Sequence, residues 1–109
     1  MADTLKVLGQ AAPSAATETD LYTVPARTMT TVSSLLVCNR DGSAHVFRIA
    51  VRPKGAAISN EHYLYYGTSL AANAAMAIIV GMTLSEADVV TVYDTDGNLS
   101  FTLFGVETT

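Results

Sequence analysis

Residues 94–98, "DTDGN", are the stretch of this chain whose side chains come closest to a metal-binding motif. An EF-hand calcium loop begins with carboxylates at alternate positions, as in Asp94 and Asp96, and ends with a glutamate at its twelfth position. Counted from Asp94, the twelfth residue is Gly105, so a calcium loop of that form cannot close. The segment also fits a tight β-hairpin turn, because Asp96-Gly97 lies between two alternating apolar runs. The sequence favours the turn and leaves Asp94 and Asp96 as weak candidates for a surface ion.

Residues for nucleophilic catalysis or zinc binding are scarce. The chain contains one cysteine, Cys38, and two histidines, His45 and His62, at positions that form no recognised motif. Nucleophilic catalysis requires a base beside the nucleophile and a group that orients the base, and zinc requires three or four ligands. Cys38 lies in the apolar run "SSLLVCNR", which is typical of a buried thiol. We therefore expect no catalytic residue, no cofactor and no enzymatic activity.

The segment 61–67, "EHYLYYG", carries the strongest indication of a binding surface. A strand here would place Tyr63 and Tyr65 on one face, and exposed tyrosines bury a large area at low entropic cost when a partner binds. The alternative is that these tyrosines only cover an edge of the core, and the sequence leaves both interpretations open. The preceding strand alternates and turns its arginines outward. The candidate interface residues are Tyr63, Tyr65, Arg48, Arg52 and Leu8.

The composition indicates a globular domain that binds neither nucleic acid nor a membrane. Of 109 residues, 50% are hydrophobic and 15% are charged, so apolar burial can offset the entropy of ordering the chain. The net charge is −4 and the six basic residues are scattered, whereas nucleic-acid binders concentrate positive charge on one face. No apolar run approaches the ~20 residues that span a bilayer, and no basic segment followed by a long apolar stretch is visible near Met1. We expect a protein that is made in the cytoplasm.

Alternating apolar and polar residues predict an all-β domain. The run "HVFRIAVRP", residues 45–53, has the clearest period of two. The Ala-rich stretch "AANAAMAIIVGM" has the composition of a helix, but the short distance between the flanking strands favours a strand there. Seven runs have strand character, at residues 21–25, 28–39, 45–53, 62–67, 76–81, 89–93 and 99–105. Their spacing predicts a single β-sandwich of six to seven strands, Ig-like or jelly-roll-like, with a small barrel as the alternative.

Turn and composition signals divide the chain further. Asp41-Gly42 separates two strand runs and predicts a hairpin between them. Residues 1–19 are expected to form an extended N-terminal arm, since residues 9–20 are small and polar and include a proline, and residues 20–109 are expected to form the sandwich domain. An arm of this composition is either frayed or laid against a neighbouring molecule.

Six short motifs follow one another over nearly the whole chain from Lys6: "YTVPA", "CNR", "FRIAV", "HYLYYG", "DVVTVY" and "NLSFTLFG". Their order resembles that of a family of small β-sandwich virion structural proteins from tailed bacteriophages. The motifs are structural, so they imply a building block and not a reaction. The resemblance implies a virion protein that is made in the host cytoplasm and forms a homo-oligomer, a trimer or a ring. Its implied partner is the major capsid protein or the neck and tail proteins.

Three functions are consistent with this resemblance and with the composition. The first is a capsid decoration (cement) protein that stabilises the head by bridging neighbouring capsid subunits, with the N-terminal arm as a clamp. The alternative is a neck, tail or baseplate component that forms a ring. The third is a module that recognises the host surface or a glycan through its exposed tyrosines. The sequence does not separate head from tail, because the motifs concern the fold alone.

Overall fold

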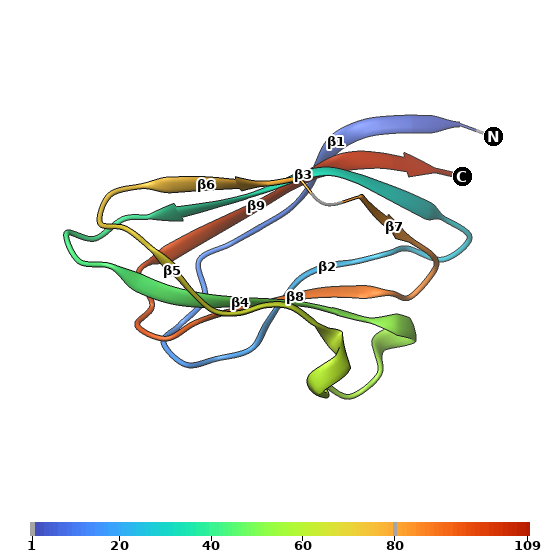
Figure 1. Cartoon of the computed structure of the whole chain (residues 1–109). Helices are drawn as coiled ribbons and strands as arrows, with labels where there is room; N and C mark the ends of the chain where they lie inside the picture. Colours follow the sequence, from blue (N-terminus) through green and yellow to red (C-terminus); the bar gives the residue numbers. More distant parts are fainter. Residues whose placement is uncertain (1, 80) are drawn as a thin grey trace.

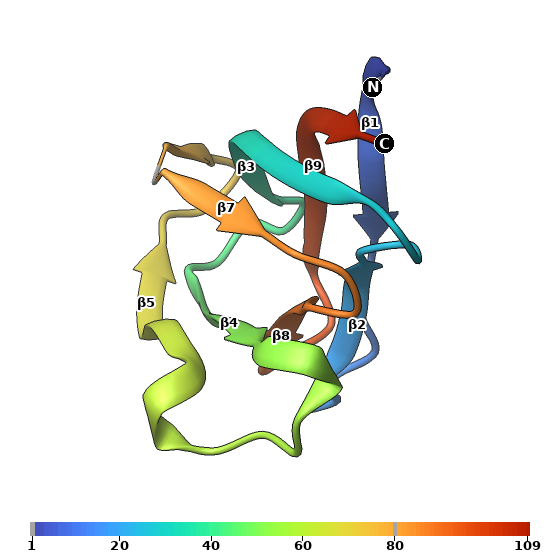
Figure 2. The same ribbon diagram turned by 90° about the vertical axis from the view of Figure 1, so that its right-hand side faces the viewer.

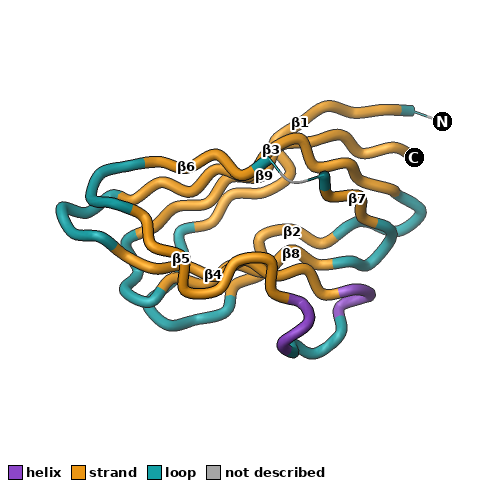
Figure 3. The backbone as a smooth tube through the Cα atoms, viewed as in Figure 1, coloured by secondary structure: helices purple, strands orange, loops and turns teal. Residues whose placement is uncertain are grey.

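The computed structural model describes residues 2–79 and 81–109, and it shows an all-β protein in which two antiparallel sheets pack face to face (Figure 1 and Figure 3). In spatial order, the five-stranded sheet contains β1 (Asp3–Ala11), β9 (Leu99–Thr108), β3 (Met29–Asn39) and β6 (Ala75–Ile78), with β7 (Met82–Leu84) also paired to β3. The four-stranded sheet contains β2 (Thr19–Thr23), β8 (Val89–Asp94), β4 (His45–Arg52) and β5 (Tyr63–Leu70). Two short 3-10 helices, η1 (Pro53–Gly55) and η2 (Asn60–His62), lie between β4 and β5. Within the described residues, no helix has the length and apolar character needed to cross a membrane.

The strands of the first half of the chain pair antiparallel with those of the second half, as in a single long hairpin that folds over into two sheets. The innermost pair is β4 with β5, and the next pairs outward are β3 with β6 and β7, β2 with β8, and β1 with β9. Successive pairs fall alternately in the two sheets, which is the strand order of a jelly roll. The two ends of the chain lie together, as Figure 2 also shows, and Ala2 and Thr109 exchange two backbone hydrogen bonds of 2.9 Å. The predicted β-sandwich is therefore confirmed.

The core lies between the sheets and follows from the alternation in each strand. Phe47 and Ile49 of β4 face Leu35 of β3 and Phe101 and Leu103 of β9, and none of these side chains is more than 1% exposed. In β3 and β9, buried side chains alternate with more exposed ones, as the two-residue period of a strand requires. The other side chains lie on the two outer faces, which together with the sheet edges are the surfaces available to a partner.

Two strands of the five-stranded sheet, β1 and β7, lie in segments that were not expected to form strands. The predicted arm of residues 1–19 contains β1, which pairs with β9 from Asp3 to Ala11 apart from a bulge at Leu8, and Pro13 after it is buried. The small residues of this segment permit close packing, since a side chain at Gly9 would overlap the carbonyl oxygen of Leu21. The Ala-rich stretch forms strand β6, as predicted, and β7 follows it. Within residues 2–79 and 81–109, the sandwich therefore has nine strands instead of six or seven.

The two Asp-Gly turns join the sheets and do not close hairpins. Asp41-Gly42 connects β3 of the five-stranded sheet to β4 of the four-stranded sheet, and Asp96-Gly97 connects β8 back to β9. Gly97 has a φ of 80°, so the turn conformation itself is the one that its sequence predicts. The hairpin predictions are wrong because turn residues only reverse the chain, whereas burial of the apolar face of each strand selects its partner.

Candidate functional site

Three of the five tyrosines lie on the outer face of the four-stranded sheet, but they do not include both members of the pair that was predicted to be exposed. The register of β5 against β4 shifts between Tyr63 and Tyr65. A bulge of this kind reverses the alternation of side chains along the strand. Tyr65 therefore packs against the core, with its ring centroid 6.1 Å from that of Phe47, while Tyr63 lies on the outer face. The prediction that Tyr63 and Tyr65 share one exposed face is corrected accordingly.

Arg48 lies between two tyrosine rings on this outer face. Its guanidinium carbon is 4.2 Å from the ring centroid of Tyr66 on β5 and 4.1 Å from that of Tyr93 on β8. Tyr63 packs edge-on against Tyr66 with the centroids 4.9 Å apart. Cation–π contacts contribute about 0.5–1 kcal/mol each at exposed sites, and here they hold the rings in one arrangement. We refer to Tyr63, Tyr66, Tyr93 and Arg48 as the tyrosine face.

The charges at the tyrosine face are paired, which leaves its apolar surface as the dominant feature. Glu18 accepts a hydrogen bond of 3.0 Å from the Tyr63 hydroxyl and lies 3.9 Å from Nη1 of Arg48. Burial, and then the Glu18 carboxylate, raise the pKa of Tyr63, so its hydroxyl remains a donor at neutral pH. Tyr66 is nevertheless 62% exposed and the adjacent Leu64 is 46% exposed. Preordered aromatic and arginine side chains are typical anchors of protein interfaces.

Arg52 and Leu8, the other two predicted interface residues, are used within the fold. Arg52 donates hydrogen bonds to Asp20 at 2.8 Å, to the Thr91 hydroxyl at 3.0 Å and to the Ala56 carbonyl at 2.9 Å. These bonds connect the end of β4 to β2, to β8 and to the β4–β5 connection. Leu8 is half-buried at a bulge in β1 and packs against the core. Neither side chain is available as an anchor for a partner.

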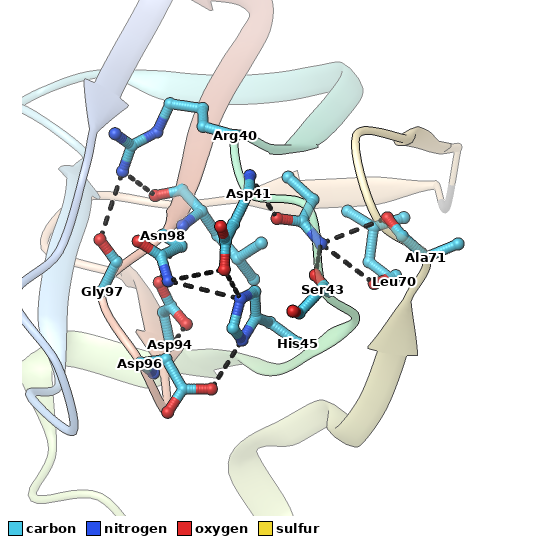
Figure 4. A network of polar contacts seen from close by, with 12 residues as sticks. Arg40, Asp41, Ser43, His45, Leu70, Ala71, Asp94, Asp96, Gly97 and Asn98 are labelled. Carbon is cyan, nitrogen blue, oxygen red and sulfur yellow. Dashed lines mark hydrogen bonds and ion pairs between the residues drawn. The ribbon is translucent and has the colours of Figure 1, made fainter.

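A second polar cluster joins the two sheet-to-sheet turns at one end of the sandwich (Figure 4). His45 Nδ1 is 2.6 Å from a carboxylate oxygen of Asp96, and Nε2 is 2.7 Å from one of Asp41. Asn98 donates a hydrogen bond of 3.4 Å to Asp41. The His45 side chain is only 8% exposed. Because both ring nitrogens face carboxylate oxygens, the arrangement favours the doubly protonated, positively charged imidazole.

Asp94 and Asp96, the weak candidates for a bound ion, stabilise this turn and cluster. Asp94 is fully buried and accepts hydrogen bonds from the backbone N–H groups of Leu99 at 2.8 Å and Asp96 at 3.1 Å. The Asp96 carboxylate is paired with His45. Within residues 2–79 and 81–109, no three His, Cys, Asp or Glu side chains are grouped so that they could hold a metal ion. The arrangement of Asp94 and Asp96 is that of a hydrogen-bonded turn.

Cys38 and an open hollow beside β1 and β9 lie apart from the two polar clusters described above. Cys38 is exposed, contrary to the expected buried thiol, because Val37 and Asn39 on either side of it point inward. The hollow has a volume of about 340 Å³ and contains no titratable side chain. Its lining residues are Gln10, Ala11, Ala12, Ser100, Phe101 and Thr102.

The tyrosine face and the histidine cluster both include residues that the sequence did not reveal. Tyr93 lies in a run that is apolar at almost every position. The sequence of this run has no alternation from which the outward orientation of Tyr93 could be predicted. Glu18, which accepts the hydrogen bond from Tyr63 of this face, lies in the segment that was expected to form an arm. Asp96 is 51 residues from His45, and only the spacing of Asp41 and His45, four residues apart, was a local indication of contact.

Comparisons of the chain with protein-family models, with curated proteins and with solved structures find no match. The inference of function therefore depends on the fold and on the two outer faces of the sandwich. Of these features, the tyrosine face combines exposed apolar area with side chains that are already fixed in position.

The histidine cluster is expected to make the stability of the fold depend on pH. The hydrogen bonds to Asp41 and then to Asp96 raise the pKa of His45 above its ordinary value of 6.5. A raised histidine pKa stabilises the folded state fully below pH 6.5, and this stabilisation is lost as the pH rises through the folded-state pKa. The His45 hydrogen bond also lowers the pKa of Asp41 below 3.8, and that contribution is lost only as the pH falls through the lowered value.

We expect His45→Gln to be less stable than the unsubstituted protein at about pH 6, and the difference in melting temperature to shrink as the pH rises to about 9. Thermal melts at both pH values measure this difference. His62→Gln is the matched control, because His62 is equally buried at 9% exposure but accepts a hydrogen bond from the Ser59 N–H and has a single carboxylate neighbour, Glu61, at 4.0 Å. A His45→Gln difference of the same size at both pH values would contradict a charged imidazole.

Proposed function

We propose that this protein is a non-enzymatic virion structural protein of a tailed bacteriophage, a capsid decoration (cement) protein that bridges neighbouring subunits of the head. The observation that carries this proposal is the tyrosine face, where Tyr66 is 62% exposed and stacked on Arg48 above a rigid sheet. Such preordered anchors lose little conformational entropy on binding. The jelly-roll strand order adds support by analogy, since this architecture recurs in viral capsid domains.

A bridging protein needs a second contact surface, and the outer face of the five-stranded sheet provides one. Its exposed side chains from β1 and β3 include three large apolar ones, Leu5 at 78%, Val7 at 47% and Leu36 at 36% exposure. The two outer faces point in opposite directions because the sheets are packed against each other (Figure 2). On a symmetric shell, many weak bridges of this kind act together at high effective concentration.

A neck, tail or baseplate ring is the alternative role for the same surfaces. In a ring, the tyrosine face of one copy would contact a neighbouring tail or neck protein, and only a few copies would be bound per particle. The two roles differ in the particle that carries the protein. Separated heads and tails that lack the protein therefore distinguish them.

The experiment adds tagged protein to heads and to tails, sediments each, and measures the protein in the pellets. We expect binding to heads at many copies, and we expect Tyr66→Ala to weaken it at least roughly tenfold, as for a central interface residue. Ile58→Ala is the matched control, since Ile58 is 39% exposed in the β4–β5 connection and lies outside the tyrosine face.

Binding to tails alone at a few copies would replace the decoration role with the tail role. Unchanged binding of Tyr66→Ala to heads would leave decoration in place but exclude the tyrosine face as the contact. Failure to sediment with either particle would contradict the virion proposal itself.

A further inference from the structure

Among the strands of the described residues, β1 is the longest that has a free edge. It contains nine residues, and β9 is its only partner among these strands, so it lies at the periphery of the five-stranded sheet (Figure 1). The other long edge strand, β5, is interrupted by two register shifts and by Gly67 with a φ of 67°. A long unpaired edge presents a row of backbone donors and acceptors, which favours pairing with another chain.

The hydrogen bonding of the chain ends shows which backbone groups of β1 point to the free edge. Ala2 and Thr109 exchange both of their backbone hydrogen bonds. Bonded and non-bonded pairs alternate along an antiparallel ladder, so Thr4 and Lys6 also direct their backbone groups to β9. The backbone groups of Asp3, Leu5 and Val7 therefore point away from β9, toward the edge on which no described strand lies.

Exposed apolar side chains accompany these free backbone groups. Leu5 is 78% exposed and Val7 is 47% exposed. Both lie on the outer face of the sheet, opposite Val106 and Phe104 of β9, respectively. The apolar surface thus continues to the very edge of the sheet, where a second strand would cover it.

We propose that two copies of this chain pair antiparallel along β1, about a two-fold axis that passes through Leu5 perpendicular to the sheet. The two five-stranded sheets then form one continuous sheet. Asp3 forms a hydrogen-bonded pair with Val7 of the second copy, Leu5 with Leu5, and Val7 with Asp3. This inference concerns the isolated protein and does not depend on the proposed role in the virion.

The charges of β1 and the length of its free edge favour an axis through Leu5 over an axis through Lys6 or Thr4. An axis through Lys6 would place two lysines directly opposite each other, and like charges in that position are destabilising. An axis through Thr4 would leave Val7 outside the paired segment. From Gly9 onward a second copy cannot pair with the edge of β1, because Gly9 lies against the backbone of Leu21. With the axis at Leu5, Lys6 is opposite Thr4 and remains paired with Glu107 of its own chain at 3.2 Å.

Sedimentation equilibrium of the whole chain tests the proposal. The average mass is expected to rise with concentration from 11.5 kDa toward twice that value. Leu5→Lys and Leu5→Asp are each expected to remain monomeric, because each places like charges opposite each other at the axis. An equimolar mixture of the two variants is expected to recover the dimer, since opposite charges then meet. Val46→Lys, an exposed substitution on the four-stranded sheet, is the control and should dimerise normally.

Each outcome decides a part of the proposal. A wild-type protein that stays monomeric from micromolar to millimolar concentration would overturn it, as would a Leu5→Lys variant that dimerises like the wild type. Loss of the dimer in both single variants without recovery in the mixture would overturn the Leu5-centred register. Thermal melts confirm that the variants are folded, which the exposure of Leu5 leads us to expect. Head binding that fails while the dimer forms would refute the virion role alone.

Discussion

Replacing Phe47 with alanine is expected to lower the free energy of unfolding by about 4 kcal/mol, within the usual range for a buried phenylalanine. Phe47 is fully buried at the centre of the sandwich. Its ring centroid is 6.3 Å from that of Phe101 on β9, in an edge-to-face arrangement, and it also contacts Tyr65 on β5. The side chain therefore links the four-stranded sheet to the five-stranded sheet, and the cavity left by its removal would lie between them.

Urea denaturation of Phe47→Ala measures this loss, and Phe104→Ala is the matched control. Phe104 lies half-buried on the outer face of β9, where its removal opens no internal cavity, so we expect a loss of about 1 kcal/mol or less. A double-mutant cycle with Phe101→Ala is expected to show coupling, because the two rings are in contact. Equal losses for Phe47→Ala and Phe104→Ala would show that the centre of the core lies elsewhere.

Replacing Asp94 with alanine is expected to lower the free energy of unfolding by about 3 kcal/mol, because two backbone N–H groups at the β8–β9 turn lose their acceptor. Asp94 is fully buried, so water does not easily take the place of its carboxylate. The turn also carries Asp96, which holds His45 and through it the β3–β4 turn. We therefore expect the variant to weaken the whole end of the sandwich.

Asp88→Ala is the matched control for Asp94→Ala. Asp88 likewise accepts two backbone N–H hydrogen bonds, from Ser85 and Lys54 at 2.9 Å each, but it is only half-buried. Water can replace that carboxylate, so a loss of about 1 kcal/mol is expected. A chelator is expected to leave the melting temperature of the unsubstituted protein unchanged. A lower melting temperature with chelator would show that Asp94 and Asp96 hold an ion after all.

The strands could be predicted from the sequence because alternation is a local property. The period of two in residues 45–53 determines that Phe47 and Ile49 face the core, whichever strand lies beside them. The same argument placed a strand in the Ala-rich stretch, where β6 lies. The argument from alternation failed for β1. The small polar residues that follow this edge strand are typical of an extended arm, and its pairing with β9 is not visible in the sequence.

The partners of the strands were decided by the tertiary structure. Asp41-Gly42 and Asp96-Gly97 turn the chain as predicted from their residue types, but each turn leads into the opposite sheet. The reason is that a strand pairs where its apolar face is best buried, and that depends on residues far away along the chain. The contact of His45 with Asp96 exists only because these two crossings lie side by side.

The tyrosine face likewise depends on the tertiary structure. A strict alternation would have put Tyr63 and Tyr65 on one face, and the bulge in β5 separates them. Arg48 was correctly placed outward by its own strand, whereas its stacking between Tyr66 and Tyr93 requires three adjacent strands from distant parts of the chain. The sequence by itself determined where most of the strands lie and which of their side chains alternate, but it did not reveal β1 or β7. Only the fold decided which side chains meet, because register, bulges and sheet order are set by packing between distant segments.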